Sequence, residues 1–331
     1  MPPSRDVVRL VDVAKLAGVT VSTASRALAR PDMVRPETRE RVELAAAELG
    51  YAPNRAARSL ITGRTGVIAI MVPDLANTYF AHIARAAQQF ARARSYEVLI
   101  VDTGDDQLRE REFIESAPTW VEGLIVCAAK RAYRPSARRV PMVFVNRRVR
   151  GSHSVLLDQH FVVEAQLRHL IELGHEQIVW MDGPKGYWAS SIRRTHARRV
   201  GAGHPIRIAD PVTPDWEGGV AMAEMLDDDT TAVAAFNDRQ ALGFIMRCSQ
   251  LGIRVPDDVS VVGSDDIAGA AVLNPGLTTV HAPKEEMGRA AVSLLLDHLT
   301  DGDAVICETL RGHLVVRGST GPPRPSSGRK E

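Results

Sequence analysis

Near the N-terminus, apolar residues recur with helical spacing in two short segments. In the first, residues 10–17, the apolar positions are Leu10, Val13, Ala14 and Leu16. The second begins at Thr20, whose hydroxyl can cap a helix, and its candidates for burial are Val19, Ala24, Ala27 and Leu28. Gly18 lies in the turn between them. The pattern predicts a helix-turn-helix, whose second helix enters the DNA major groove, although paired short amphipathic helices also occur in other small domains.

A third helix is expected directly after this pair. Proline is tolerated at the first position of a helix, and Pro36 precedes a helical pattern over residues 37–49 that Gly50 can end. The residue before the proline is Arg35, a poor cap that can cost about 1 kcal/mol of local stability. Three helices in the first fifty residues make a minimal bundle.

The next stretch, residues 51–66, has two interpretations. Asn54 can cap a short helix over residues 55–60, and glycines follow it. A helix of this length is not stable alone. The stretch is therefore either a plain linker or a hinge helix that folds only on DNA.

From residue 67 onward, apolar strands alternate with amphipathic helices. The first strand, residues 67–72, is an unbroken apolar run, which is typical of a parallel strand covered on both faces. Further strands are expected over residues 97–102, 123–127, 141–146, 177–181, 232–236, 260–263 and 308–317. Helices are expected over residues 79–94, 108–117, 160–173, 239–251 and 284–299. This alternation predicts an α/β body with doubly wound parallel sheets.

Composition adds bounds to this picture. The chain has 331 residues, enough for two or three domains, and 45% of them are apolar. The net charge is only +1, but residues 1–64 contain 11 Lys and Arg against 7 Asp and Glu, which suits phosphate contact at that end. The Pro-, Gly- and Ser-rich residues 318–331 predict a disordered tail without the apolar heptads of a tetramer bundle.

The cysteines and the hydrophobic runs indicate where the protein is located and whether it binds a metal. Cys127, Cys248 and Cys307 are far apart, each in an apolar or helical context, so we expect reduced, buried thiols and no metal or cofactor. The N-terminus lacks the apolar core of a signal peptide, and no run of about 18 apolar residues occurs. We therefore expect a cytoplasmic protein without a membrane span.

Residues 9–66 resemble the DNA-binding headpiece of the lactose/galactose repressor (LacI/GalR) family of bacterial transcription regulators. The matching stretches are DVAKLAGVTVSTASRAL, PETRERVELAAAELGYAPNRAARSL and TGRT, in that order and at fitting spacing. The resemblance extends over nearly all of the rest. It implies a helix-turn-helix headpiece (1–52), a hinge helix and linker (53–66) and an effector-binding and dimerisation domain (67–317). That domain would have two subdomains, like a periplasmic sugar-binding protein, with crossovers near 147–157, 277–284 and the entry to the last strand.

The resemblance also implies which residues contact DNA. In the recognition helix and its start they are Thr20, Val21, Ser22, Thr23, Ser25 and Arg26, with Arg26 suited to guanine and Val21 to a thymine methyl group. In the hinge they are Asn54, Ala57 and Leu60. Leu60 matches the family's wedge, which opens a minor-groove step; the alternative for this residue is packing on the adjoining body.

An effector site is expected where strands end at the cleft. The residues that match the family's pocket are Asn77, Tyr79, Phe80, Asn146, Asp158, Arg193, Trp216, Asn237 and Asp265. Carboxylates, amides, a guanidinium group and aromatic faces together suit a sugar. Three structural alternatives stay open: an ion pair for Asp265 and Arg193, core packing for Trp216, and helix capping for Asp238.

The function that follows is a homodimeric regulator, a repressor of transcription, with two heads on a pseudo-palindromic operator. Its operator affinity would be controlled by a small-molecule effector, a sugar by the chemistry of the site. A periplasmic-type sugar-binding protein without DNA function is the alternative, and the headpiece argues against it. An enzyme is not expected, because the first strand is followed by VPDLAN rather than GxGxxG, and neither a P-loop nor GxSxG occurs.

Overall fold

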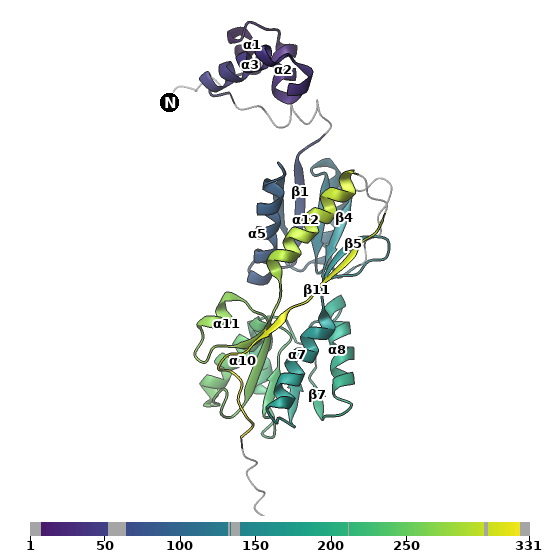
Figure 1. The fold of residues 1–331 in the computed structure, drawn as a ribbon. Helices are drawn as coiled ribbons and strands as arrows, with labels where there is room; N and C mark the ends of the chain where they lie inside the picture. Colours follow the sequence, from purple (N-terminus) through teal and green to yellow (C-terminus); the bar gives the residue numbers. More distant parts are fainter. Residues whose placement is uncertain are drawn as a thin grey trace, which may run out of the picture. The chain divides into compact units, whose positions relative to one another are not determined.

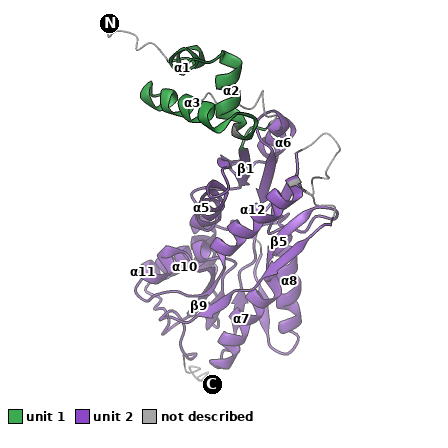
Figure 2. Ribbon diagram, turned by 45° about the horizontal axis from the view of Figure 1, so that its top comes forward, with its two compact units in different colours: residues 1–66 green, residues 67–331 purple. Residues whose placement is uncertain are grey.

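The computed structural model describes residues 8–51, 64–131, 133, 140–210, 212–300 and 304–324. The chain forms two compact units, residues 1–66 and 67–331, which Figure 2 draws in different colours. Figure 1 traces the order of helices and strands along each of them. Each unit has its own apolar core and is described by itself below.

The first unit is a small helical bundle. Its described elements are α1 (Leu10–Leu16), α2 (Val21–Ala29), the short 3-10 helix η1 (Pro31–Met33) and α3 (Pro36–Glu48). Its core consists of small side chains, which let the helices approach closely: Val13, Ala14, Ala17, Ala24, Ala27, Val42, Ala45 and Ala46. The turn before α2 is possible because Gly18 adopts a φ of +65°. As expected, the Thr20 hydroxyl caps α2 by accepting from the Thr23 N–H at 3.2 Å, and Arg35 gives α3 no side-chain cap.

The second unit contains two α/β subdomains. The first subdomain has a six-stranded sheet in the order β11-β5-β4-β3-β1-β2, and all of its pairings are parallel. Its strands are β1 (Val67–Val72), β2 (Glu97–Asp102), β3 (Gly123–Cys127), β4 (Met142–Val145), β5 (His153–Leu157) and β11 (Cys307–Leu310). Helices α5 (Thr78–Arg92) and α12 (Lys284–Thr300) cover one face, and α6 (Gln107–Ser116) with the 3-10 helix η2 (Ala117–Thr119) covers the other.

The second subdomain repeats this plan with the order β12-β10-β9-β8-β6-β7, in which only β12 runs antiparallel to its neighbour. Its strands are β6 (Ile178–Trp180), β7 (Ile206–Ile208), β8 (Ala232–Ala234), β9 (Ser260–Asp265), β10 (Thr278–His281) and β12 (His313–Val315). Helices α7 (Gln159–Glu172) and α8 (Trp188–Val200) pack on one face. Helices α9 (Trp216–Glu224) and α10 (Asp238–Leu251) pack on the other, and the short α11 (Ala268–Val272) adjoins α10.

The chain passes between the subdomains three times. The passages follow β5 at Asp158, follow β10 at residues 282–283, and join β11 to β12 at residues 311–312. The single strand expected over 308–317 is therefore wrong, because its two halves belong to different sheets. Two of the passages touch here: a Cβ atom added to Gly312 would lie 2.0 Å from the carbonyl oxygen of His281.

Part of the expected disordered tail is also wrong. Ser319 is fully buried, and its hydroxyl accepts from the Thr278 N–H at 2.8 Å and donates to the Val261 carbonyl at 2.6 Å. The carbonyl oxygen of Gly321 accepts from the His175 ring at 2.9 Å. These bonds anchor the start of the tail to the second sheet, whereas residues 325–331 lie outside the described residues.

The cysteine prediction holds for two of three residues. Cys127 and Cys248 are buried, but Cys307 is exposed, because β11 is the edge strand of its sheet. All three are free thiols. Strands β7 and β10 and helices α9 and α11 were not predicted, since each is short and carries little periodicity. Strand β5 was not predicted either, because residues 153–157 were expected in the first crossover, which instead follows them at Asp158. Within the described part of the chain, no helix is long and apolar enough to cross a membrane.

Candidate functional site

Helix α2 presents a mixed polar surface at its N-terminal half. Ala24 and Ala27 face the core, while Val21, Ser22 and Arg26 are exposed. The Thr20 hydroxyl lies 3.0 Å from the Ser22 hydroxyl and 2.9 Å from that of Thr23, and Arg26 Nε donates to the Ser22 carbonyl at 3.2 Å. The structure thus brings together all six candidates of the recognition helix: Thr20, Val21, Ser22, Thr23, Ser25 and Arg26. The other three candidates, Asn54, Ala57 and Leu60, lie outside the described residues.

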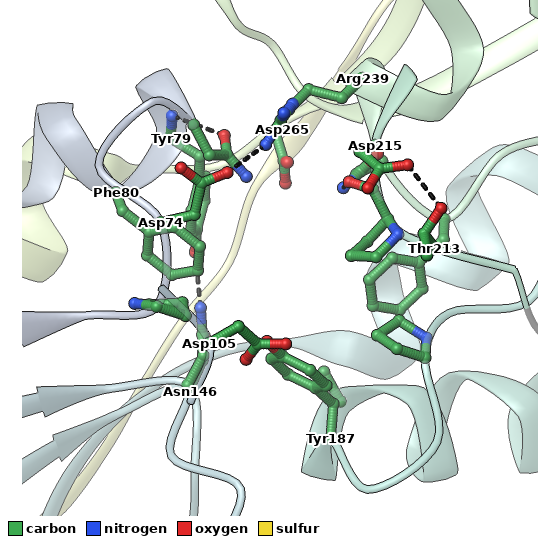
Figure 3. A pocket seen from close by; sticks show the side chains of 18 of the residues that line it. Asp74, Tyr79, Phe80, Asp105, Asn146, Tyr187, Thr213, Asp215, Arg239 and Asp265 are labelled. Atoms are coloured by element: carbon green, nitrogen blue, oxygen red, sulfur yellow. Dashed lines mark hydrogen bonds and ion pairs between the residues drawn. The ribbon is translucent and has the colours of Figure 1, made fainter. Parts of the chain in front are cut away.

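A pocket of about 240 Å³ lies between the two subdomains of the second unit (Figure 3). Its walls are the loops and helix starts that follow the carboxyl ends of the strands in both sheets, as the doubly wound topology requires. Seven of the nine predicted effector residues line it: Asn77, Tyr79, Phe80, Asn146, Arg193, Asn237 and Asp265. The sequence patterns did not single out several others: Pro73, Asp74, Asp105, Gln159, Tyr187, Thr213, Asp215, Phe236 and Arg239.

On the first-subdomain wall, the polar side chains bond to backbone N–H groups and, in one case, to each other. The Asn77 amide caps α5 by accepting from the Tyr79 N–H at 3.1 Å. Asn146 accepts from the Leu157 N–H at 3.0 Å and donates to the Tyr79 hydroxyl at 2.6 Å. Burial, and then the nearby Asp265, raises the pKa of Tyr79, so its hydroxyl stays protonated. Both amides hold the wall in place, and the Nδ2 of Asn77 keeps its two donors unused among the described residues.

On the second-subdomain wall, Arg193 is the main donor. Its Nε donates to Gln159 Oε1 at 2.6 Å and its Nη1 to the Phe236 carbonyl at 2.5 Å, and its guanidinium group lies 4.7 Å from the centre of the Phe236 ring. An arginine has five N–H donors, so three of them are not used in these bonds. Asn237, in contrast, caps α10 by accepting from Gln240 N–H and donates to the Pro214 carbonyl, so its amide is occupied.

Asp265 provides the buried acidic group of the pocket. It ends β9 with a φ of +122° and is only 8% exposed. Burial, and next the neighbouring charge of Asp238, raise its pKa to about 8, while Arg193 and Lys284 oppose the shift. Asp238 itself lies outside the pocket lining: its carboxylate accepts from the Thr279 hydroxyl at 2.5 Å and from the Ile267 N–H at 2.9 Å.

Two interactions cross the pocket from one subdomain to the other. Asp74, just after β1, pairs with Arg239 in the first turn of α10 at 2.5 Å. Tyr187, just before α8, donates its hydroxyl to Asp105, which also pairs with Lys130 at 2.5 Å. Figure 3 shows Asp105 and Tyr187 meeting at one edge of the cavity. Sequence patterns missed these residues because no local spacing relates one wall to the other.

Two predicted effector residues are placed elsewhere, which corrects the prediction for them. The Asp158 carboxylate caps α7 by accepting from the Phe161 N–H at 3.0 Å, and the following residue, Gln159, lines the pocket instead. Trp216 begins α9 with its side chain 41% exposed, outside the pocket lining, whereas Thr213 and Asp215 before it contribute to the wall. Its exposure also rules out the core packing considered for it. Among the described residues, no group of three or more His, Cys, Asp or Glu side chains could hold a metal ion.

A helix-turn-helix unit joined to a two-subdomain α/β body with a polar pocket defines a class of protein, the ligand-responsive transcription regulators. Comparison with known families agrees for both parts. Residues 9–54 match the bacterial regulatory proteins of the lacI family, and residues 167–320 match a periplasmic binding protein-like domain. The HTH-type transcriptional repressor CytR of Escherichia coli strain K12 is 32% identical over 334 residues, covering 93% of this chain and 95% of the repressor.

The chain therefore belongs to the lacI family and is a DNA-binding regulator of transcription. Two solved structures are similar over almost the whole length. A lac repressor dimer bound to operator and the anti-inducer ONPF has a TM-score of 0.79 and 26% identity, covering 95% of this chain and 99% of that one. The transcriptional regulator CelR in complex with cellobiose has a TM-score of 0.68 and 29% identity, covering 94% and 99%.

Proposed function

We propose that this chain is a homodimeric repressor whose affinity for a pseudo-palindromic operator is controlled by a sugar in the pocket between the subdomains. The observation that carries this proposal is the pocket itself, because it draws polar groups from both subdomains of a chain that also has a recognition helix. A ligand that contacts both walls favours one degree of closure over another. The alternative, a sugar-binding protein without DNA function, leaves the exposed face of α2 without a role.

At the DNA, the proposed roles follow the chemistry of each side chain. Arg26 donates two hydrogen bonds to a guanine, and Val21 contacts a thymine methyl group. Thr20, Thr23 and Ser25 bind phosphates, which fix the position of the headpiece without reading the sequence. In the proposed hinge, residues 53–66, Leu60 wedges into the minor groove while Asn54 and Ala57 line it.

At the effector, Asp265 and Arg193 are the proposed recognition pair. Both are buried, and both keep bonding capacity that the protein does not use, so neighbouring hydroxyl groups can accept from the guanidinium group and hydrogen-bond with the carboxyl group, which its raised pKa keeps protonated at neutral pH. Phe80 and Phe236 offer apolar faces to the ring. The likeness to CelR, whose structure contains cellobiose, supports a sugar. We assign Asn146 and Asn237 to positioning, because the oxygen and the nitrogen of each amide are already bonded, and we assign the unused Nδ2 donors of Asn77 to the ligand.

The proposed coupling runs through closure of the pocket. Effector binding changes the separation of the two walls, and this motion changes the spacing of the two hinge segments in the dimer and hence the affinity for the operator. We further propose that the protein acts in the cytoplasm, by binding alone, without turning over a substrate.

A two-stage experiment tests this function. Full-length protein selects sites from a random duplex DNA library, and the recovered site is then titrated in a mobility-shift assay at several salt concentrations. We expect a two-fold symmetric site and an affinity that falls steeply with salt. A panel of sugars is then screened by thermal shift, and a hit must change operator affinity. Recovery of no preferred sequence would refute the regulator, whereas a selected site without any responsive sugar would refute only the effector class.

A further inference from the structure

A second cavity, of about 600 Å³, lies in the second unit outside the pocket described above. We call it the β4–β5 groove, because the loop between these strands forms much of it. Arg148, Arg150 and Ser152 come from that loop, Cys307 comes from the edge strand β11, and Trp188 comes from the start of α8. The two arginines and Cys307 belong to the first subdomain and Trp188 to the second, so this groove also spans both.

Arg148 and Arg150 give the groove its charge. Both are exposed, and within the described ranges neither forms an ion pair or a hydrogen bond. The adjacent Arg147 shows the contrast, because its guanidinium group donates to the carbonyls of Ala129 and Lys130 at 2.7 and 2.9 Å. Among the described residues that line the groove, no side chain is a carboxylate. Two guanidinium groups on one loop, without an acidic partner among the described residues, favour an oxyanion, which they can bind with paired hydrogen bonds.

Ser152 adds an independent indication of a ligand. The residue is only 4% exposed and lines the groove, yet its hydroxyl has no hydrogen-bond partner among the described residues. A tight turn holds it there, in which the Ser152 N–H donates to the Val149 carbonyl at 3.2 Å and Gly151 adopts a φ of +78°. A buried hydroxyl without a partner costs free energy, and a ligand oxygen in the groove would supply the missing partner.

Trp188 connects the groove to the effector pocket. It is the first residue of α8, and its neighbours on either side, Tyr187 and Ala189, line the effector pocket. The cap position of this 13-residue helix, Tyr187, provides no side-chain hydrogen bond, so the first turn keeps N–H groups that favour negative charge nearby. The indole of Trp188 offers an apolar surface opposite the arginine-bearing loop.

We propose that the β4–β5 groove binds a second small molecule, an organic anion. Its phosphate or carboxylate group lies between Arg148 and Arg150 and accepts from Ser152, and its ring packs on Trp188. Because one short segment, residues 187–189, borders both cavities, occupancy of the groove changes affinity in the effector pocket, and the reverse holds to the same extent. The binding site stands independently of the DNA-binding proposal, since it can be measured on the free protein.

Cys307 makes the groove measurable in the full-length protein. It is exposed, whereas Cys127 and Cys248 are buried, so N-ethylmaleimide labels one thiol in the folded chain. The labelling rate is followed by mass spectrometry during titration with ribose 5-phosphate, inorganic phosphate or citrate. Ribose is the control for the sugar without its phosphate group. Potassium chloride at matched ionic strength is the control for non-specific screening of charge by salt. Phosphate and citrate separate the two kinds of anionic group.

We expect ribose 5-phosphate to slow labelling, and ribose and potassium chloride to leave the rate unchanged. The R148Q/R150Q variant should need at least about tenfold more ligand for the same protection, because each arginine supplies a charge-assisted bond. W188F should weaken binding of ribose 5-phosphate more than binding of inorganic phosphate. R168Q, which removes an exposed arginine of α7 paired with Glu164, is the matched control and should behave like the parent. Absence of protection by all three anions, equal protection in R148Q/R150Q, or equal slowing by potassium chloride would overturn the proposal.

Discussion

The Asp74 carboxylate and the Arg239 guanidinium group lie 2.5 Å apart and join the two subdomains across the effector pocket. Their side chains are 38% and 28% exposed, so water and salt screen the pair in part. This ion pair and the Tyr187–Asp105 hydrogen bond both connect the two subdomains in this conformation. Both contacts depend on the separation of the two walls, so a ligand that changes this separation must form or break them.

Removing the pair should open the pocket. D74N and R239Q should each shift the population of the second unit toward open forms, seen as a larger radius of gyration in small-angle scattering and faster hydrogen exchange at residues 187–193. A partly exposed pair contributes modestly, so a change of a few-fold in the closed-to-open ratio is expected. The charge-swapped variant D74R/R239D should restore closure in part. If both single variants scatter like the parent at low salt, the pair does not hold the pocket closed.

Asp265 should make stability depend on pH. Burial raises its pKa to about 8, well above the ordinary value of 3.8, so between these values the folded state holds a proton that the unfolded state has lost. Stability should accordingly fall as the pH rises through that window. D265N should remove this contribution to the dependence of stability on pH and raise the Tm at pH 8. It should also weaken binding of the proposed effector. The exposed Asp229 provides the control D229N, and melting curves at pH 5, 6.5 and 8 give the comparison. Parallel Tm profiles of D265N and the parent would contradict the assignment.

His175 should act in the opposite direction. Burial lowers its pKa below 6.5, so as the pH falls the unfolded chain takes up a proton before the folded one, and stability is lost below about pH 6.5. H175Q should be less stable than the parent at pH 7. Its unfolding free energy, measured by urea denaturation, should fall less between pH 7 and pH 5. H204Q, at an exposed histidine, should leave the fall unchanged. An unaltered pH slope in H175Q would show that other groups carry it.

Helices α9 and α10 pack at close range through glycine. A Cβ atom on Gly219 would lie 2.1 Å from the Gln240 carbonyl oxygen, a backbone atom that cannot move without displacing α10. G219A should therefore cost on the order of 2 kcal/mol or more. A Cβ atom on Gly203 would meet no atom within 4 Å, so G203A is the matched control and should be nearly neutral. Denaturant unfolding of both variants measures the difference; equal midpoints would mean that the helices can separate at little cost.

Operator choice should depend on the exposed positions of α2. Exchanging Val21 and Ser22 for other side chains should change the selected DNA sequence while leaving the response to the effector intact, because both side chains are outside the core of the first unit. Selection from the same random library compares parent and variants. A substitution of Ala24, in the core, is the contrast and should lower headpiece stability instead. Identical selected sites for parent and Val21/Ser22 variants would place base recognition elsewhere.

Local chemistry explains why much of the fold could be predicted. The Thr20 cap, the turn at Gly18 and the apolar run of β1 depend on neighbours in sequence, so their pattern is visible in the chain. Polar residues at strand ends could be assigned to the pocket because parallel strands bring their carboxyl ends to one edge. Asn146 and Asp265 line the pocket for that reason, whereas Tyr79, Phe80 and Arg193 lie within helices and were named by the resemblance alone.

What escaped prediction depends on geometry across long sequence distances. Asp74 and Arg239 meet only because two separately folded walls close on each other. Asp158 was expected in the pocket but caps α7, and the next residue, Gln159, for which nothing was predicted, lines the pocket. The burial of Ser319 needs the strands β9 and β10 beside it, and composition alone describes that segment as an unstructured tail.

The three passages of the chain between the subdomains have a consequence for protein synthesis. The last passage joins β11, the edge strand of the first sheet, to β12, the edge strand of the second. Neither sheet can be completed until residues 307–315 have left the ribosome, although the headpiece emerges first and has a core of its own. Until then β5 has no partner on one side and β10 lacks its antiparallel neighbour, so the nascent chain exposes two open sheet edges that can pair with other chains. Truncation before residue 307 should accordingly leave a protein that aggregates, while its first fifty residues still fold.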